Sequence, residues 1–154
     1  MSKAQQVYQS VITHLQKTKF RFEPIESSMM IHVEVNTEDL PIHAFIRILE
    51  DKDVLQIICP QGSKVPEDKR IETAVAVAVA NYGMINGGFD LDMSDGSLHF
   101  RLTHSYQAAL PDDDQLHYLI GCALTTMNQY NDRFFMLSKG MMDLEKFIEL
   151  ENSK

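Results

Sequence analysis

The sequence predicts an α+β domain in which helices pack against a largely antiparallel sheet. Segments with apolar residues at helical spacing alternate with shorter segments in which every second residue is apolar. The shorter segments follow one another across tight turns, and strands joined in this way run antiparallel. We expect the order helix, three strands, helix, two strands, helix, in one domain over residues 1–139 with a helical tail over residues 140–154.

Composition narrows the possible classes of function. The chain has 154 residues, of which 44% are hydrophobic, and its 14 basic and 22 acidic side chains give a net charge of −8. The length suits one compact domain, and the hydrophobic content is ordinary for a globular protein. The acidic balance argues against a general binder of nucleic acid or of anionic membranes, because both need clustered lysine and arginine.

The sequence also indicates a compartment. It holds no uninterrupted apolar stretch of about 18 residues, so we expect no transmembrane helix. The first nine residues lack the charged and apolar segments of a secretory signal. Cys59 and Cys122 are far apart and lie in apolar segments, which favours reduced core residues over a disulfide. Together these features predict a cytoplasmic protein.

The first helix is expected from Ser2 to about Thr18, with Ser2 and Gln5 forming a capping box. Its apolar stripe comprises Ala4, Val7, Tyr8, Val11, Ile12 and Leu15. A short alternating segment at Phe20–Glu23 is interrupted by Pro24. Met30–Val35 then alternates as a strand, with Ile31, Val33 and Val35 toward the core.

A hairpin is expected around Asp51-Lys52, between strands at Pro41–Glu50 and Asp53–Cys59. A loop of these two residues pairs Ile48 with Leu55, Ile46 with Ile57 and Arg47 with Gln56. Phe45 and Ile58 then share the face of Arg47, so that face is not wholly polar. We expect either that another element covers it or that it is a contact surface, and Phe45, Arg47 and Ile58 are the candidate partner-binding sheet face.

The second helix is expected to open at Val65–Arg70, where Pro66 and the acidic residues are typical of a helix start. Its body is ambiguous, because Val75, Val77 and Val79 alternate as in a strand. The start signal and the many alanines favour a helix, and Asn81-Tyr82-Gly83 is a plausible stop.

A second hairpin is expected around Asp95-Gly96, a dipeptide typical of tight turns. This loop pairs Met93 with Leu98, Leu91 with Phe100 and Phe89 with Leu102, and places Asp92 opposite His99 and Asp90 opposite Arg101. The last long helix runs from Pro111 to about Leu137, and Gly140 separates it from the tail. Its apolar stripe comprises Leu116, Leu119, Ile120, Ala123, Leu124, Met127 and Tyr130.

Several segments in order resemble the YbjN-domain family of the type III secretion chaperone-like superfamily: Val65–Arg70, Asn81-Tyr82-Gly83, Gly88–Asp92, Asp95-Gly96, Phe100-Arg101, Thr126-Met127 and Tyr130. The likeness covers about residues 3–139 and does not separate this family from an uncharacterised cyanobacterial branch of the superfamily. It implies a secretion-chaperone-like fold, a dimer and a role in bacterial sensory transduction or regulation, and it implies no catalytic residues. Asn131-Asp132 departs from the family, where relatives often carry an aromatic residue and a proline.

The residues themselves indicate no catalytic, cofactor or metal site. Asp90, Asp92 and Asp95 do not match a calcium loop, because the third acid comes one residue late and the distal glutamate is missing. The six histidines show no zinc-ligand spacing and are read as surface residues. There is neither a G-x-S-x-G motif nor a phosphate-binding G-x-x-x-x-G-K-[ST] loop.

The second helix is the most informative element for function. Ile71, Ala74, Val75, Ala78 and Tyr82 form one apolar stripe, and Thr73, Val77, Ala80 and Met84 form another. A helix that is apolar nearly all round is expected to be buried on two sides. The sheet can cover one side, and the last helix of the same chain or a second copy would cover the other. The predicted dimer interface comprises Ile71, Val75, Ala78, Val79 and Tyr82.

The sequence therefore predicts a non-enzymatic homodimeric module that binds a protein or peptide, as a chaperone-like or regulatory adaptor without a cofactor. The alternative is a regulator that binds a small ligand, or an unrecognised enzyme. A pocket with several converging titratable groups would favour this alternative.

Overall fold

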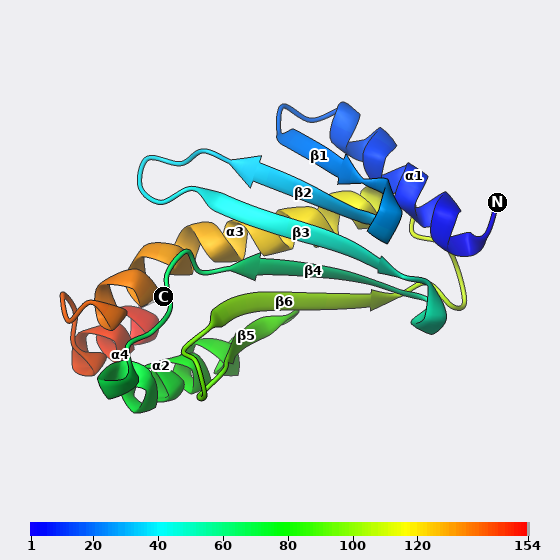
Figure 1. Ribbon diagram of the computed structural model, residues 1–154. Helices are drawn as coiled ribbons and strands as arrows, with labels where there is room; N and C mark the ends of the chain where they lie inside the picture. The colour runs from blue at the N-terminus through cyan, green and yellow to red at the C-terminus, as the bar shows by residue number, and fades with distance from the viewer. Residues whose placement is uncertain (154) are drawn as a thin grey trace.

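The computed structural model describes residues 1–153 and contains, within them, a six-stranded antiparallel sheet of order β1-β2-β3-β4-β6-β5 (Figure 1). The strands are β1 (Arg21–Ile25), β2 (Met30–Val35), β3 (Ile42–Leu49), β4 (Val54–Pro60), β5 (Gly88–Leu91) and β6 (Leu98–Ser105). The helices are α1 (Lys3–Gln16), α2 (Arg70–Tyr82), α3 (Asp113–Ser138) and α4 (Leu144–Asn152). The predicted α+β class and order are confirmed, and β1 adds an edge strand at the segment interrupted by Pro24.

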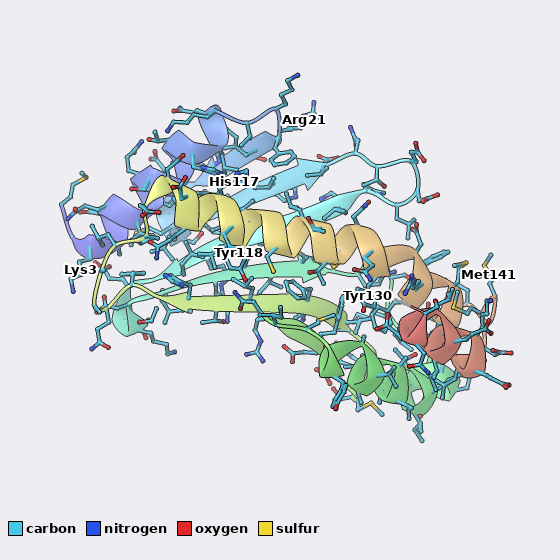
Figure 2. All side chains as sticks on the ribbon, turned by 180° about the vertical axis from the view of Figure 1, so that it is seen from behind. Lys3, Arg21, His117, Tyr118, Tyr130 and Met141 are labelled. Carbon is cyan, nitrogen blue, oxygen red and sulfur yellow. The ribbon has the colours of Figure 1, made fainter. Side chains whose placement is uncertain are left out.

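Within residues 1–153, the helices that cover the sheet lie on one of its faces. Helices α1 and α3 run side by side across that face, while α2 and α4 pack together at one end of the sheet, next to β5 (Figures 1 and 2). The core lies between α1, α3 and the sheet, where alternate strand residues point. Its largest fully buried side chains include Ile31, Ile46, Leu55, Ile57, Phe100, Leu102, Tyr130 and Phe134.

The first hairpin has the predicted register. Ile46 pairs with Ile57, and Ile48 with Leu55. The loop is longer than expected, because η2 (Glu50–Lys52) forms a 3₁₀ turn and Asp53 follows it with a φ of 51°. The apolar alternation determined the pairing even though the turn type was wrong.

The second hairpin differs from the prediction by two residues. Phe89 pairs with Phe100 and Leu91 with Leu98, so Met93 lies outside the ladder. The strand ends early because Asp92 starts a turn: its side chain accepts hydrogen bonds from Ser94, and its backbone bonds with Ser97 and Gly96. A shift of two residues leaves every side chain on its original face, so the hydrophobic pattern cannot detect it.

Residues 70–82 form a helix, as predicted despite the alternating valines, and η3 (Glu67–Lys69) precedes it. Gly140, with a φ of 73°, separates α3 from the tail. The tail contributes to the core, because Phe147 is fully buried against Phe134, with ring centroids 5.2 Å apart. Within residues 1–153, no helix is both long enough and apolar enough to cross a lipid bilayer.

Candidate binding surfaces

The face of the sheet opposite α3, which we call the open face, is not covered by any helix (Figure 1). The registers place one row of side chains across it: His32 opposite Phe45, Phe45 opposite Ile58, and Ile58 opposite Arg101. Phe45 and Ile58 are half-buried, although the residues that alternate with them are buried in the core. The structure therefore places Phe45, Arg47 and Ile58 on one face, in the predicted register. Of the two expectations for this face, cover by another element or a contact surface, cover by a helix of the described residues is not found.

Aromatic rings extend this apolar row toward β2. The His32 ring stacks on Phe45 with centroids 4.7 Å apart and on His43 with centroids 5.2 Å apart. His32 Nε2 lies 2.9 Å from His43 Nδ1, within hydrogen-bond distance. These three rings form a continuous aromatic surface. No local sequence pattern indicates the pairing of the two histidines, because they lie on different strands.

The two arginines of the open face differ in their partners. Arg101 Nε lies 2.7 Å from Asp90 Oδ2, so its charge is balanced locally. Arg47 is exposed and donates a hydrogen bond to Gln56 Oε1 at 3.3 Å, and it forms no ion pair with the residues that the structure describes. Arg47 therefore offers an unbalanced positive charge next to Phe45 and Ile58.

Both edges of the sheet hinder the addition of a further strand. At the β5 edge, the Asn81 side chain donates to the Phe89 carbonyl at 3.0 Å and accepts from the Phe89 N–H at 2.8 Å, so these backbone groups are already paired. At the other edge, β1 contains Pro24, which has no N–H to donate. The open face, rather than a strand edge, is therefore available to an extended partner.

Helix α2 presents one apolar stripe to the rest of the chain and one to solvent. Thr73, Ala76 and Ala80 are buried. Ile71 is 76% exposed, Val75 43% and Tyr82 95%, and Ala78 is also exposed, whereas Val79 is partly buried. Val75, Ala78, Val79 and Tyr82 line a groove of about 540 Å³ together with the end of α4. The five residues of the predicted dimer interface thus lie along one side of α2, and all of them except Val79 are exposed beside α4.

A recessed pocket of about 240 Å³ lies at the end of the sheet, where the loop before β3, the segment after β4 and the C-terminal half of α3 meet. Pro41, Pro60 and Phe135 supply apolar walls, and His43 extends into its lining from the open face. Asn131 on α3 also lines it and is 5% exposed. Two signals in the sequence concern Asn131: with Asp132 it departs from the family pattern, and four residues after Met127 it interrupts the apolar stripe of the helix.

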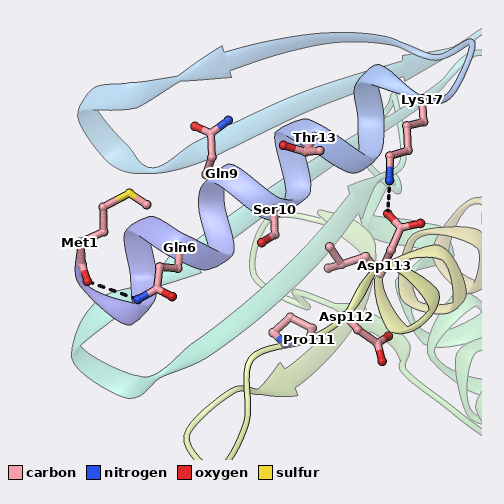
Figure 3. Close-up of a pocket in the computed structure, with 10 residues that line it drawn as sticks. Met1, Gln6, Gln9, Ser10, Thr13, Lys17, Pro111, Asp112 and Asp113 are labelled. Carbon is pink, nitrogen blue, oxygen red and sulfur yellow. Dashed lines mark hydrogen bonds and ion pairs between the residues drawn. The ribbon is translucent and has the colours of Figure 1, made fainter.

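A larger but shallower hollow of about 420 Å³ lies between α1 and the start of α3 (Figure 3). Most of the side chains around it are polar, and Lys17 Nζ contacts Asp113 Oδ1 at 3.4 Å on its rim. Asp113 also lies 2.9 Å from His14 Nδ1, and these contacts hold the pKa of Asp113 below its usual value. His14 is buried, so the prediction of a surface residue was wrong for this histidine.

The acidic residues near the second hairpin have structural partners. Hydrogen bonds from Ser94 lower the pKa of Asp92, and those from Ser97 lower the pKa of Asp95. Within residues 1–153, no group of three or more His, Cys, Asp or Glu side chains is arranged to hold a metal ion. The predicted pairing of Asp92 with His99 is wrong. Asp90 contacts Arg101, as predicted, and it also contacts His99.

The comparisons with known proteins agree with this architecture. Residues 8–136 match a family model described as "YbjN: Putative bacterial sensory transduction regulator". The chain belongs to the YbjN family. No curated protein matches it. The matched range runs from α1 into the last turns of α3, and it includes the open face, α2 and the recessed pocket but not α4.

Proposed function

We propose that this YbjN-family chain is a non-enzymatic, cytoplasmic, homodimeric regulator that binds a segment of another protein on the open face. The observation that carries the proposal is the uncovered row through Phe45 and Ile58 on a sheet whose other face is fully packed. A sheet normally buries its apolar side chains against another layer, so an uncovered apolar row is typical of a binding surface. The family description as a regulator supports a binding role over a catalytic one.

The chemistry of the open face indicates the kind of segment that it binds. Phe45 and Ile58 favour apolar side chains, and Arg47 offers two N–H groups in the geometry that a carboxylate accepts. The protein as a whole carries a charge of −8, so an arginine without an acidic partner is a local exception. We infer an extended peptide segment with apolar residues and at least one acidic residue.

Selection from a random peptide library displayed on phage would test this proposal. We expect enriched peptides that combine apolar residues with Asp or Glu. Binding should weaken at least about tenfold in Phe45→Ser and in Arg47→Glu, since central aromatic and arginine side chains commonly dominate binding energy. Tyr118→Ser is the matched control, because Tyr118 is an exposed aromatic residue on α3, on the other side of the sheet.

Two outcomes would contradict the proposal. Peptides could bind the Phe45 and Arg47 variants as tightly as the unchanged protein, or the Tyr118 control could lose binding equally. Failure of Phe45→Ser to fold would not obscure the result, because Phe45 is only half-buried and Arg47→Glu changes an exposed residue independently.

A second copy of the chain is the proposed occupant of the α2 stripe. The helix carries no charged residue from Thr73 to Tyr82, so it is a face on which two chains of charge −8 can meet without placing like charges in contact. Small Ala78 in the middle of the stripe permits close approach of a second helix. A two-fold axis through this stripe would give a self-complementary contact.

A further inference from the structure

The recessed pocket at the end of the sheet contains polar groups without partners. Within residues 1–153, four buried side-chain polar atoms have no hydrogen-bond partner, and two of them belong to residues that line this pocket: Asn131 Oδ1 and Ser63 Oγ. A buried polar group left unpaired is costly to a fold. Two such groups at one pocket are therefore an independent indication that something pairs with them.

The surroundings hold Asn131 in place. Its Nδ2 group donates to the Pro41 carbonyl at 3.4 Å, and its backbone carbonyl accepts from Gln61 Nε2 at 3.4 Å. These contacts fix the residue between the loop before β3 and the segment after β4. The side-chain amide thus donates one hydrogen bond through Nδ2, while its acceptor Oδ1 is unpaired. A ligand that pairs with Asn131 Oδ1 must therefore supply a hydrogen-bond donor.

The lining also restricts the charge and size of a ligand. None of the residues that line the pocket is an acid, a lysine or an arginine. The titratable residue in the lining is His43, which already lies within hydrogen-bond distance of His32, so the lining favours a neutral ligand over an ion. Phe135 provides an aromatic wall. A volume of about 240 Å³ lies below the range for drug-sized ligands and suits a molecule of roughly ten non-hydrogen atoms.

We propose that this pocket binds a small neutral ligand with an aromatic or heterocyclic ring and an N–H donor, with the donor pairing with Asn131 and the ring packing on Phe135. The proposal does not depend on the dimer or on the peptide-binding role of the open face. His43 connects the two regions, because it lines the pocket while it pairs with His32, which stacks on Phe45. The pocket is thus placed to sense a ligand close to the surface proposed to bind a partner.

Three probes of similar size test this chemistry: benzamide is neutral with an N–H donor, toluene has no donor, and benzoate is an anion. Binding to the full chain can be followed by ¹H–¹⁵N NMR, including the side-chain amide signals of Asn131 and Gln61. We expect benzamide to bind with a Kd on the order of 1 mM, because so small a ligand gains little free energy. Toluene and benzoate should each bind at least about fivefold more weakly. Toluene leaves the Asn131 Oδ1 acceptor unpaired, and benzoate brings a negative charge into the pocket.

Two substitutions locate the binding. Gly62→Leu should narrow the pocket, because Gly62 belongs to its lining. The fold can accept the larger residue, since a Cβ at Gly62 meets no atom within 4 Å. Asn131→Leu should weaken benzamide binding at least about fivefold, because it removes the acceptor Oδ1. Thr125→Leu is the control, as an exposed position of α3 outside the pocket.

Several results would overturn the proposal. One such result is that benzamide changes no NMR chemical shift up to about 20 mM, well above the Kd expected for a ligand of this size. Water alone would then be the partner of the unpaired oxygens. Toluene could bind equally well, or benzamide could bind the Gly62 and Asn131 variants unchanged. Tighter binding of N-acetyl-L-leucinamide to the same residues would instead assign the pocket to a side chain of a partner polypeptide.

Discussion

The carboxyl group of Asp132, next to Asn131 on α3, illustrates how one residue links the fold to pH. Burial raises its pKa, and the hydrogen bond and negative charge of Asp39 raise it further. A raised pKa in the folded state means that Asp132 contributes stability at acidic pH, and this contribution is lost as the pH rises through the folded pKa. Asp132→Asn should therefore raise the free energy of unfolding at pH 7, by a few tenths to about 1 kcal/mol given solvent screening.

Chemical denaturation at several pH values between about 4 and 7 would measure this effect. The gain of Asp132→Asn should shrink as the pH falls, because the native carboxyl then becomes protonated. Glu38→Gln is a suitable control, since Glu38 is exposed in the same loop as Asp39. A gain that grows toward acidic pH would contradict the assignment.

Cys59 is the second residue whose surroundings determine its chemistry. It is fully buried, and burial raises the pKa of its thiol to about 12. The thiolate is the reactive form, so iodoacetamide at pH 8 should modify Cys59 at least about 100-fold more slowly in the folded protein than in urea. Mass spectrometry of the intact chain and its peptides would follow the reaction, with half-buried Cys122 as the internal comparison. Modification of folded Cys59 at the rate found in urea would contradict its burial.

At the scale of elements, the turn between β5 and β6 depends on Gly96. Its φ is 82°, and a Cβ added there would lie 2.1 Å from the Val65 carbonyl oxygen. The same glycine accepts a hydrogen bond from the Val65 N–H, which joins this turn to the start of η3. Gly96→Ala should cost about 2–4 kcal/mol of unfolding free energy by chemical denaturation, from backbone strain and the clash with Val65.

Gly121→Ala provides the matched comparison for this change. A Cβ at Gly121 meets no atom within 4 Å, and alanine favours a helix interior over glycine by about 0.5–1 kcal/mol. The two glycine-to-alanine variants should therefore shift stability in opposite directions. Equal effects at the two positions would show that the turn does not need its left-handed residue.

The two hairpins show how far sequence patterns determine an element. Both were predicted from apolar alternation, and the first has the predicted register although its loop is longer. The second is displaced by two residues because the side chain of Asp92 forms a turn with Ser94. Alternation distinguishes the two faces of a strand but not registers that differ by two, so side-chain hydrogen bonds in the turn determined the result.

At the scale of the whole molecule, the sequence predicted the fold class, the element order and the two stripes of α2, because these depend on local periodicity. It also placed Phe45, Arg47 and Ile58 on one face, since a hairpin register fixes which side chains are neighbours. It did not predict the recessed pocket, whose lining comes from three segments distant in the chain. Such a site depends on how the end of the sheet meets α3, which no local pattern encodes.

The dimer proposed from the exposed stripe of α2 gives the last prediction. If a second copy covers the stripe as proposed, light scattering at micromolar concentration should give twice the chain mass of 17.6 kDa. Val75→Asp should reduce the mass to that of one chain, because the contact would bury an unpaired charge. Val75 is 43% exposed, so a single chain should accept the aspartate without unfolding.

Thr125→Asp, which adds the same charge at an exposed position of α3, should leave the dimer intact. An unchanged protein that measures 17.6 kDa across this concentration range would refute the dimer, whereas the open face and the pocket could still bind their ligands in a single chain.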